Sequence, residues 1–575
     1  MLLFADAAAV FSEIEKRSGR LEMTDVLSTL FKRAEGKEIG KLVYFIQGIV
    51  APPYEGIDLG VGERFAIAAI ASASGYSAND VEKSYKKGGD LGDTAEALMA
   101  KRKQTALSTT EMGVTYVYDA MVKIANASGQ GSQDQKIKHL TELLNNSSPL
   151  EARYIVRFVL GRLRLGVGDP TILDAISVAH SGDKSLREPL ERAYDVCADM
   201  GYVAERFYEN PDSIMDFHVE PFRPLMPALA EREDSPESIM KRLGRCGVEM
   251  KYDGFRLQCH KKGKEVELYS RKLERMSPMF PDVVAEIRKL KCKDIIFEGE
   301  ALAYDKKKGR YFPFQQTMHR RRKHGIEEAS KEYPLNLFVF DVLFVDGQDM
   351  TDASYRERRA AVQRLFKGKV LAPSQMKIVR TPRELKKLFD EAVSSGLEGI
   401  MAKDLDAPYT AGKRKFAWIK LKKSYGKSVD TIDGVVVGYY LGRGARAEFE
   451  FGGVLVAVYN PDSGHLETVA KVATGFTEEE MVELRQVLEK IKTKAPPSNL
   501  DYKIEVDYWV EPRFVVEVAF DDITQSPNHT CAMREGKGLA LRFPRMTKMR
   551  PDKAENEITT SGEVARMFEI QRARS

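Results

Sequence analysis

The chain has 575 residues, 43% of them hydrophobic and 30% charged, which predicts a globular protein of two to four domains. No apolar run approaches the roughly 20 residues that cross a bilayer, and the first residues lack the basic lead and cleavage site of a signal peptide. The five cysteines form no CxxC pair, which argues against a structural zinc site and is typical of a reducing cytoplasm. The net charge of +4 neither requires nor excludes nucleic acid, because basic residues can gather on one face.

The N-terminal part, residues 1–217, is predicted to be helical. Segments such as 24–34, 114–127 and 150–165 carry apolar residues at spacings of three and four, the period of an amphipathic helix. Clusters of Gly, Asn and Ser separate these segments. The proline-rich stretch 220–227 cannot continue a helix, so it is suited to a domain boundary.

The next part, residues 218–427, has a different pattern. Short alternating or apolar runs such as 248–260, 295–304 and 335–347 are typical of strands, and helical stretches such as 281–290 separate them. This pattern predicts an α+β domain whose strands are mostly antiparallel.

The last part, residues 428–575, is predicted to be a small β-barrel. Strand-like runs at 433–442, 451–460 and 513–520 have the spacing of such a barrel. One charged helix, residues 477–491, interrupts them.

The segment EMKYDGFR (249–256) carries the first chemical signal. Lys251 lies between strand residues and near a glycine that lets a ligand approach the backbone. It would be a nucleophile if its amine were uncharged, which nearby cations such as Arg256 would favour. The alternative is a surface lysine that pairs with Asp253.

Five more short motifs follow this lysine in order. They are SR (270–271), FEGE (297–300), FVFD (338–341), EGIMAK (398–403), and an arginine followed by WIKLK (414 and 418–422). The ordered set closely resembles the covalent nucleotidyltransferase superfamily of ligases and capping enzymes, in which the first motif's lysine attacks the α-phosphate of a nucleotide. Each motif alone has an ordinary structural explanation, such as a solvated strand end or a core aromatic. Such separate explanations do not account for six motifs in the order found in the superfamily.

The resemblance implies a role for each matching residue. Lys251 is the residue that becomes adenylylated, and Phe340 is the ring that stacks on adenine. Glu398 is a metal ligand, Glu300 reaches the ribose or a metal, and the two lysines of WIKLK lie near the α-phosphate. The expected nucleotide-binding residues of these motifs are Glu249, Arg256, Arg271, Glu300, Phe340, Arg414, Lys420 and Lys422.

Two further regions resemble ATP-dependent DNA ligases in particular. The segments LRFPR (541–545) and RPDK (550–553) resemble the family's C-terminal motif, which orients the leaving pyrophosphate; this implies such a role for Arg542 and Lys553. The helical region around 152–168 resembles the DNA-binding domain of archaeal and eukaryotic replicative ligases. Arginine side chains and backbone amides left exposed by glycine can bind DNA phosphates without recognising the bases. The alternative is that these arginines form the basic face of a solvated helix. The expected phosphate contacts are Arg153, Arg157, Arg162 and Arg164.

The resemblance covers essentially the whole chain and implies three domains: a helical DNA-binding domain (1–217), an α+β adenylyltransferase domain (218–427) and an OB-fold barrel (428–575). The expected activity is ATP-dependent sealing of single-strand nicks in duplex DNA during replication, repair and recombination, through lysyl-AMP and DNA-adenylate intermediates. Mg²⁺ is the expected metal, with Mn²⁺ as a substitute. We expect a cytoplasmic, nucleoid-associated monomer whose barrel swings about a hinge at 423–430.

Other functions are less consistent with the sequence. NAD-dependent ligases carry a cysteine-rich zinc module, capping enzymes use GTP and lack the helical N-terminal domain, and short RNA ligases lack both that domain and the RFPR segment. A non-catalytic scaffold would not need Lys251 or the carboxylates. The stretch Gln104 to Leu107 is a degenerate match to a sliding-clamp motif, without its aromatic pair, and the alternative is an exposed loop. The sequence leaves open whether ADP or NAD replaces ATP.

Overall fold

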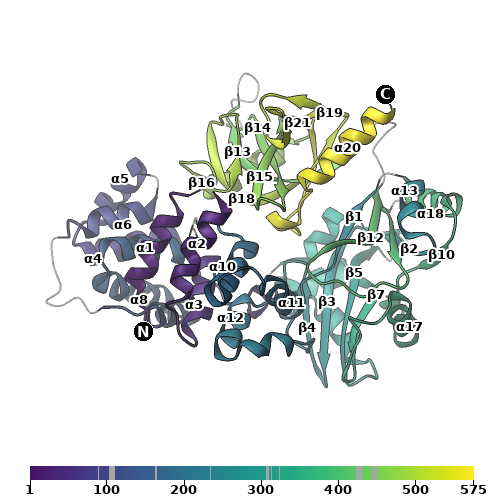
Figure 1. Cartoon of the computed structure of the whole chain (residues 1–575), viewed down its shortest axis with the longest axis horizontal. Helices are drawn as coiled ribbons and strands as arrows, with labels where there is room; N and C mark the ends of the chain where they lie inside the picture. Colours follow the sequence, from purple (N-terminus) through teal and green to yellow (C-terminus); the bar gives the residue numbers. More distant parts are fainter. Residues whose placement is uncertain are drawn as a thin grey trace.

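The computed structural model describes the chain apart from residues 18, 89, 103–110, 162, 164, 234, 306–309, 313, 323, 396, 423–429, 443–449 and 575. Three parts follow one another along the chain: a helical part, an α+β part and a β-rich part (Figure 1). In the portions that the model describes, no helix is long and apolar enough to cross a membrane. The predicted multidomain fold class is confirmed at this level.

The N-terminal part is a set of helices around one apolar core. Phe45 lies at its centre, with its ring 5.3 Å from that of Phe4 and 4.6 Å from that of Phe158. Ser148 and Glu151 form a capping box that fixes the start of α9. The helices are α1 (Phe4–Ile14), α2 (Arg20–Phe31), α3 (Glu38–Gln47), α4 (Glu63–Ser74), α5 (Ala78–Gly88), α6 (Leu91–Met99), α7 (Val114–Asn126), α8 (Ser132–Asn146), α9 (Pro149–Val159), α10 (Asp169–Ser181), α11 (Arg187–Cys197) and α12 (Met200–Glu209).

The middle part contains two main sheets. The first has the strand order β1-β12-β11-β2-β10. It consists of β1 (Leu229–Arg232), β2 (Cys246–Lys251), β10 (Met376–Val379), β11 (Gly399–Asp404) and β12 (Arg414–Lys422). Helices α13 (Pro236–Leu243) and α18 (Pro382–Ser394) pack on one face of this sheet and bury Ile400 and Ile419.

The second sheet of the middle part has the strand order β4-β3-β5-β7-β8 and is antiparallel along this path. Its apolar face packs against α14 and α17. The strands are β3 (Phe255–Lys262), β4 (Glu265–Ser270), β5 (Asp294–Asp305), β7 (Leu335–Val345) and β8 (Gln348–Asp349), with β6 (Arg310–Tyr311) and β9 (Leu371–Pro373) at its edges. The remaining helices are α14 (Pro281–Arg288), α15 (Phe314–Thr317), α16 (Ile326–Glu332) and α17 (Tyr355–Leu365).

The C-terminal part is rich in strands, and its core is formed by residues such as Val436, Val456 and Val516. A larger sheet has the order β16-β18-β13-β14-β15-β17 with β22 beside β18, and a smaller one has the order β19-β21-β20. The strands are β13 (Asp430–Tyr440), β14 (Gly453–Asn460), β15 (His465–Val472), β16 (Lys492–Thr493), β17 (Leu500–Asp501), β18 (Tyr508–Phe520), β19 (Asp522–Ser526), β20 (Cys531–Arg534), β21 (Lys537–Arg542) and β22 (Arg545–Met549), and the helices are α19 (Glu478–Lys490) and α20 (Ser561–Arg574). The OB-fold stays a prediction.

The C-terminal part contacts both other parts (Figure 1). The Arg232 guanidinium of β1 lies 2.8 Å from the carboxylate of Asp430 at the start of β13. On the other side, the Lys494 ammonium donates to the carbonyl of Lys87 at 2.9 Å. This compact arrangement places the segment after β22 against the middle part.

Candidate active site

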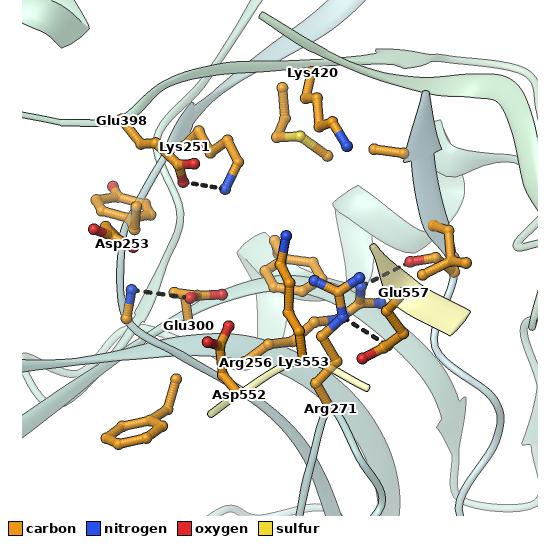
Figure 2. Close-up of a pocket in the computed structure, with 18 of the residues that line it drawn as sticks. Lys251, Asp253, Arg256, Arg271, Glu300, Glu398, Lys420, Asp552, Lys553 and Glu557 are labelled. Carbon is orange, nitrogen blue, oxygen red and sulfur yellow. Dashed lines mark hydrogen bonds and ion pairs between the residues drawn. The ribbon is translucent and has the colours of Figure 1, made fainter. Parts of the chain in front are cut away.

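A pocket lies between the two sheets of the middle part, and the C-terminal part closes it. Its lining comes from β2, β11 and β12 on one side, from β3, β5 and β7 on the other, and from the segment 550–557. Figure 2 shows Lys251 beside Glu398 on one side of the pocket, with Arg271, Lys553 and Glu557 across from them. Residues that are more than 300 positions apart in the chain therefore share one site.

Strand alternation explains which residues of the first sheet face the pocket, since successive side chains point to opposite faces. Lys251 of β2 is the register partner of Gly399 in β11, and Gly399 is the partner of Lys422 in β12. The intervening residues face the other way and pack against α13 and α18. The two further rows on the pocket face are Glu249, Met401 and Lys420, then Gly247, Lys403 and Trp418.

Gly399 separates the two lysines of its row, and only glycine fits there. Its φ is +151°, and a Cβ atom would lie 2.1 Å from the carbonyl oxygen of Leu421. An L side chain would therefore collide with backbone that cannot move without breaking the sheet. The absence of a side chain lets β11 and β12 approach each other at this row.

The carboxylate of Glu398 contacts both lysines of this row. Its Oε2 lies 2.5 Å from the Lys251 ammonium and its Oε1 lies 2.6 Å from the Lys422 ammonium. Burial by itself would raise the pKa of Glu398, but Lys251 and Lys422 outweigh burial and hold that pKa well below its usual range. Lys420, one row away, lies 3.8 Å from the carboxylate of Glu563. The predicted nucleophile and the predicted metal ligand are thus in direct contact.

The second sheet supplies the opposite wall. Arg256 donates to both oxygens of the buried Glu298 carboxylate, at 3.0 and 2.8 Å. Glu300 accepts from the backbone N–H of Gly254 at 3.1 Å. Burial raises the pKa of Glu300 to about 7, although Lys251 and Arg256 act in the opposite direction. The two hydrogen bonds to Glu298 therefore fix the Arg256 guanidinium. The cations near Glu300 only partly compensate for the burial of its carboxyl group.

Aromatic rings form one end of the pocket. The Phe340 ring is 6.0 Å from the Trp418 ring in an edge-to-face arrangement. Both rings also lie near the Lys403 ammonium, at 4.7 and 4.1 Å. The buried Glu249 carboxylate is beside this cation, at 2.7 Å. A flat apolar ring system would fit this end, while phosphates would fit the end with Lys251 and Lys422.

The C-terminal segment adds cations at the phosphate end. Lys553 is 5% exposed, lines the pocket and forms an ion pair with Asp433 of β13. Arg550 lies 3.2 Å from the same carboxylate. Arg271, which is on the rim, donates to Glu557 at 2.7 Å. The C-terminal part therefore contributes side chains to the pocket itself.

Arg542 does not have the position that the sequence predicted. Although the C-terminal part closes over the pocket, Arg542 does not line it. It is exposed at the end of β21, and the next residue, Phe543, is 68% exposed with a φ of +50°. The turn that joins β21 to β22 directs this pair to the surface. In this arrangement of the domains only Lys553 of the two lines the pocket, and the joint action of Arg542 and Lys553 on the triphosphate stays a prediction.

Arg153 and Arg157, the predicted phosphate contacts of α9, have carboxylate partners inside the N-terminal part. Arg157 lies 2.5 Å from Glu15 and 3.0 Å from Asp90, and 8% of its side chain is exposed. Arg153 shares Glu15 at 3.0 Å. Both guanidinium groups join α9 to acidic residues of neighbouring helices inside the N-terminal part. Their charge is paired with carboxylates in this structure, and the expectation that they contact DNA phosphates stays a prediction.

Several predictions concern residues that lie outside the described structure. Arg162 and Arg164, the clamp-like stretch Gln104 to Leu107, and residues 423–429 of the predicted hinge are among them. Arg414 has a described backbone in β12 but no described side chain. These expectations stay predictions.

Sequence reasoning missed several residues that line the pocket or pair with charged groups beside it. Lys403 could have been found, because it lies two and four positions after Met401 and Gly399 and so shares their face of β11. Asp433 and Glu557 gave no signal, since each acts on a cation that lies far away in the chain or in another part. Lys548 is a further case, with its ammonium 3.0 Å from Asp253.

The arrangement can bind a nucleoside triphosphate and transfer part of it. It has an aromatic end for a base, cations for phosphates, and a lysine at the junction of the two. Such a set of groups is typical of nucleotidyltransferases.

Comparisons with known proteins identify the family. Models described as DNA ligase N terminus, ATP dependent DNA ligase domain and ATP dependent DNA ligase C terminal region match residues 3–177, 227–422 and 447–553. "Probable DNA ligase" of Dictyoglomus turgidum is 44% identical, over 99% of this chain and 98% of that protein. "DNA ligase 2" of Thermofilum pendens is 41% identical over 99% and 98%, and "DNA ligase" of Saccharolobus solfataricus is 40% identical over 99% and 97%. The chain belongs to the ATP-dependent DNA ligase family, whose members seal nicks in DNA, and the predicted resemblance is confirmed.

Proposed function

We propose that this DNA ligase stores AMP on Lys251 and that the pocket around it is the site of adenylyl transfer. The observation that carries this proposal is the position of Lys251: it shares the Glu398 carboxylate with Lys422, between an aromatic end and a cationic end of one pocket. A lysine attacks phosphorus as the neutral amine, so the ion pair with Glu398 is a resting state that nucleotide binding breaks.

Adenine lies against Phe340, and the phosphates extend toward Lys422 and Lys553. The Lys251 ammonium first loses a proton to solvent; the neutral amine then attacks the α-phosphorus, the bond to the β-phosphate oxygen breaks, and pyrophosphate leaves. Lys422 compensates the charge that develops on the α-phosphate, and Lys553 compensates the charge of the leaving group. These side chains stabilise the transition state through position and charge, since their ion pairs hold them in place before the reaction.

The carboxylates fit a divalent cation such as Mg²⁺. Mg²⁺ binds through one or two carboxylates together with substrate phosphates, and Glu398 and Glu300 face one pocket. Within the described residues, no group of three acidic, histidine or cysteine side chains could form a metal site without the substrate. When bound there, the ion would supply neutralising charge beside the α-phosphate.

In the later steps AMP passes to the 5′-phosphate of a nick, and the 3′-hydroxyl displaces it. We propose that residues 1–217 hold the duplex, residues 218–427 carry the nucleotide pocket, and residues 428–575 form an OB-fold barrel. The barrel covers the pocket during the first step. It then presents a different surface to DNA, and the exposed pair Arg542 and Phe543 supports such a surface. A monomer is sufficient for this scheme.

The test is to follow label from ATP that is radioactive at the α-phosphate. The wild-type protein should take up covalent label, lose it to nicked DNA, and yield a labelled peptide that contains Lys251. Lys251→Ala should take up no label. Label on a different residue, or transfer to nicked RNA but not nicked DNA, would refute the assignment.

A further inference from the structure

The ammonium of Lys548 joins the C-terminal part to the segment that follows the proposed nucleophile. It lies 3.0 Å from the carboxylate of Asp253, which is two residues after Lys251 in the chain. The side chains of Lys548 and Asp253 are 15% and 33% exposed, so water only partly screens this ion pair. The pair therefore holds the two parts together more strongly than an ion pair on the open surface would.

Strand pairing fixes the direction of Lys548. This residue belongs to β22, and its register partner is Glu517 of β18. Burial by itself would lower the pKa of Lys548, but Asp253 and Glu517 outweigh burial and raise that pKa. Lys548 is therefore a cation with a fixed position at the boundary between the two parts.

The chain beyond Lys548 carries two further cations into the pocket. Arg550 follows Lys548 by two residues and Lys553 follows it by five, and both line the pocket. Backbone hydrogen bonds make this segment rigid, because the Arg550 N–H donates to a carbonyl of β18 at 2.8 Å and the Lys553 N–H donates to the Arg550 carbonyl at 3.1 Å. The contact of Lys548 with Asp253 thus also fixes where the two pocket cations lie relative to Lys251.

Lys548 differs from Arg271, another cation at this boundary. Arg271 donates to Glu557 across the boundary at 2.7 Å, but Arg271 also lines the pocket, so a bound phosphate competes with Glu557 for it. Lys548 is not among the described residues that line the pocket. A triphosphate in the pocket therefore leaves the contact between Lys548 and Asp253 in place.

We propose that Lys548 is a positioning residue for the adenylylation of Lys251, because its ion pair with Asp253 docks the C-terminal part over a bound triphosphate. This inference rests on the proposed function, since it requires the phosphates to lie beside Lys553. Lys548 touches no reacting atom in this scheme. Its effect is confined to the first step, because the barrel leaves the pocket before the nick is sealed.

The first test separates the steps of the reaction. Lys548→Met should lower kcat for covalent labelling of Lys251 by ATP by about tenfold or more, because loss of docking misplaces the groups around the phosphates. Sealing of nicked DNA that already carries AMP should stay at the wild-type rate. Lys548→Arg should retain most of the labelling, since a guanidinium also pairs with a carboxylate. Lys471→Met is the matched control and should change neither step, because the exposed Lys471 lies over the Tyr440 ring within the C-terminal part.

The second test measures docking without catalysis. The five native cysteines are buried, so spin labels can be attached selectively to Lys377→Cys in the middle part and Lys537→Cys in the C-terminal part, two exposed positions. Without nucleotide, the otherwise unchanged protein should show one closed distance between the labels. Lys548→Met and Asp253→Asn should each add a population at other distances. The double variant should add no more than either single one, because both changes remove the same ion pair.

Two results would overturn the inference. One is an equal loss of labelling and of sealing in both Lys548→Met and Lys548→Arg. The other is a distance between the labels that changes in neither Lys548→Met nor Asp253→Asn. A wild-type protein that takes up no covalent label from ATP would instead overturn the proposed function.

Discussion

Two cations of the C-terminal part should affect different steps of the reaction. Lys553 lines the pocket and is paired with the buried Asp433, whereas Arg542 is exposed and does not line the pocket. Lys553→Ala removes a cation beside the proposed position of the leaving pyrophosphate. Arg542→Ala leaves the pocket intact and removes charge from the surface of the barrel. The two substitutions are chemically similar, so each serves as the control for the other.

The expected magnitudes follow from these environments. Removal of one preorganised charged donor from a transition state costs roughly 10²- to 10³-fold in rate, and this is the expected loss of Lys251 adenylylation in Lys553→Ala. Removal of one partner from a buried ion pair can cost about 3–5 kcal/mol of stability. The loss should be smaller here, because Arg550 remains 3.2 Å from Asp433. Arg542→Ala should change the free energy of unfolding by no more than about 0.5 kcal/mol.

Three measurements decide the matter: uptake of AMP from ATP, sealing of nicked DNA that already carries AMP, and the thermal unfolding midpoint. Lys553→Ala should lose the first activity far more than the second. Arg542→Ala should keep the first activity and lose part of the second, with a weaker dependence on salt. If Lys553→Ala lost both activities equally and unfolded at a lower temperature, Lys553 would be a structural cation. If Arg542→Ala lost AMP uptake, the barrel would dock differently from the arrangement described.

Three further changes test other parts of the molecule. Lys251→Ala should abolish AMP uptake yet still seal pre-adenylylated nicks slowly; normal uptake would contradict the central assignment. Deletion of residues 1–217 should spare AMP uptake but weaken DNA binding and its salt dependence, and an unchanged salt slope would count against a DNA-binding role. Burial raises the pKa of Asp195 to about 7, so the contribution of this carboxyl group to stability is greatest below about pH 4 and is lost as pH rises from about 4 to 7. Asp195→Asn should therefore unfold at a higher temperature than the wild type near pH 8 but not near pH 4, a gain of up to about 4 kcal/mol; parallel profiles would refute this.

The centre of the site could be predicted because its residues belong to regular strands. Lys251 and Lys422 come from motifs whose alternation fixes the face on which a side chain lies. Register between strands is a long-range property, yet the alternation of apolar and polar residues restricts it strongly. The roles of these residues were predicted from the family resemblance, and strand alternation explains why their side chains share one face of the sheet.

The role of a charge could not be predicted in the same way. Arg153 and Arg157 form a basic row in the sequence of α9, but Glu15 and Asp90 neutralise them from other helices. Arg542 and Lys553 belong to neighbouring motifs, yet the turn at Phe543 separates their directions. Residue type and local spacing reveal that a charge is present. Only the tertiary structure reveals whether it is available to a ligand.

Within the pocket, too, the cations that could bind phosphate are already paired with carboxylates. Lys251 and Lys422 share Glu398, Arg271 is bonded to Glu557, and Lys553 is paired with Asp433. When a triphosphate binds, its phosphates replace these carboxylates as the partners of the cations. The free energy gained is therefore only the difference between a cation–phosphate contact and a cation–carboxylate contact. Arg271 belongs to the middle part and Glu557 to the C-terminal part, so this ion pair also holds the C-terminal part closed, whereas Asp433 and Lys553 pair within the C-terminal part. Nucleotide binding and closure are consequently coupled, because a phosphate that takes Arg271 from Glu557 removes a contact between two domains.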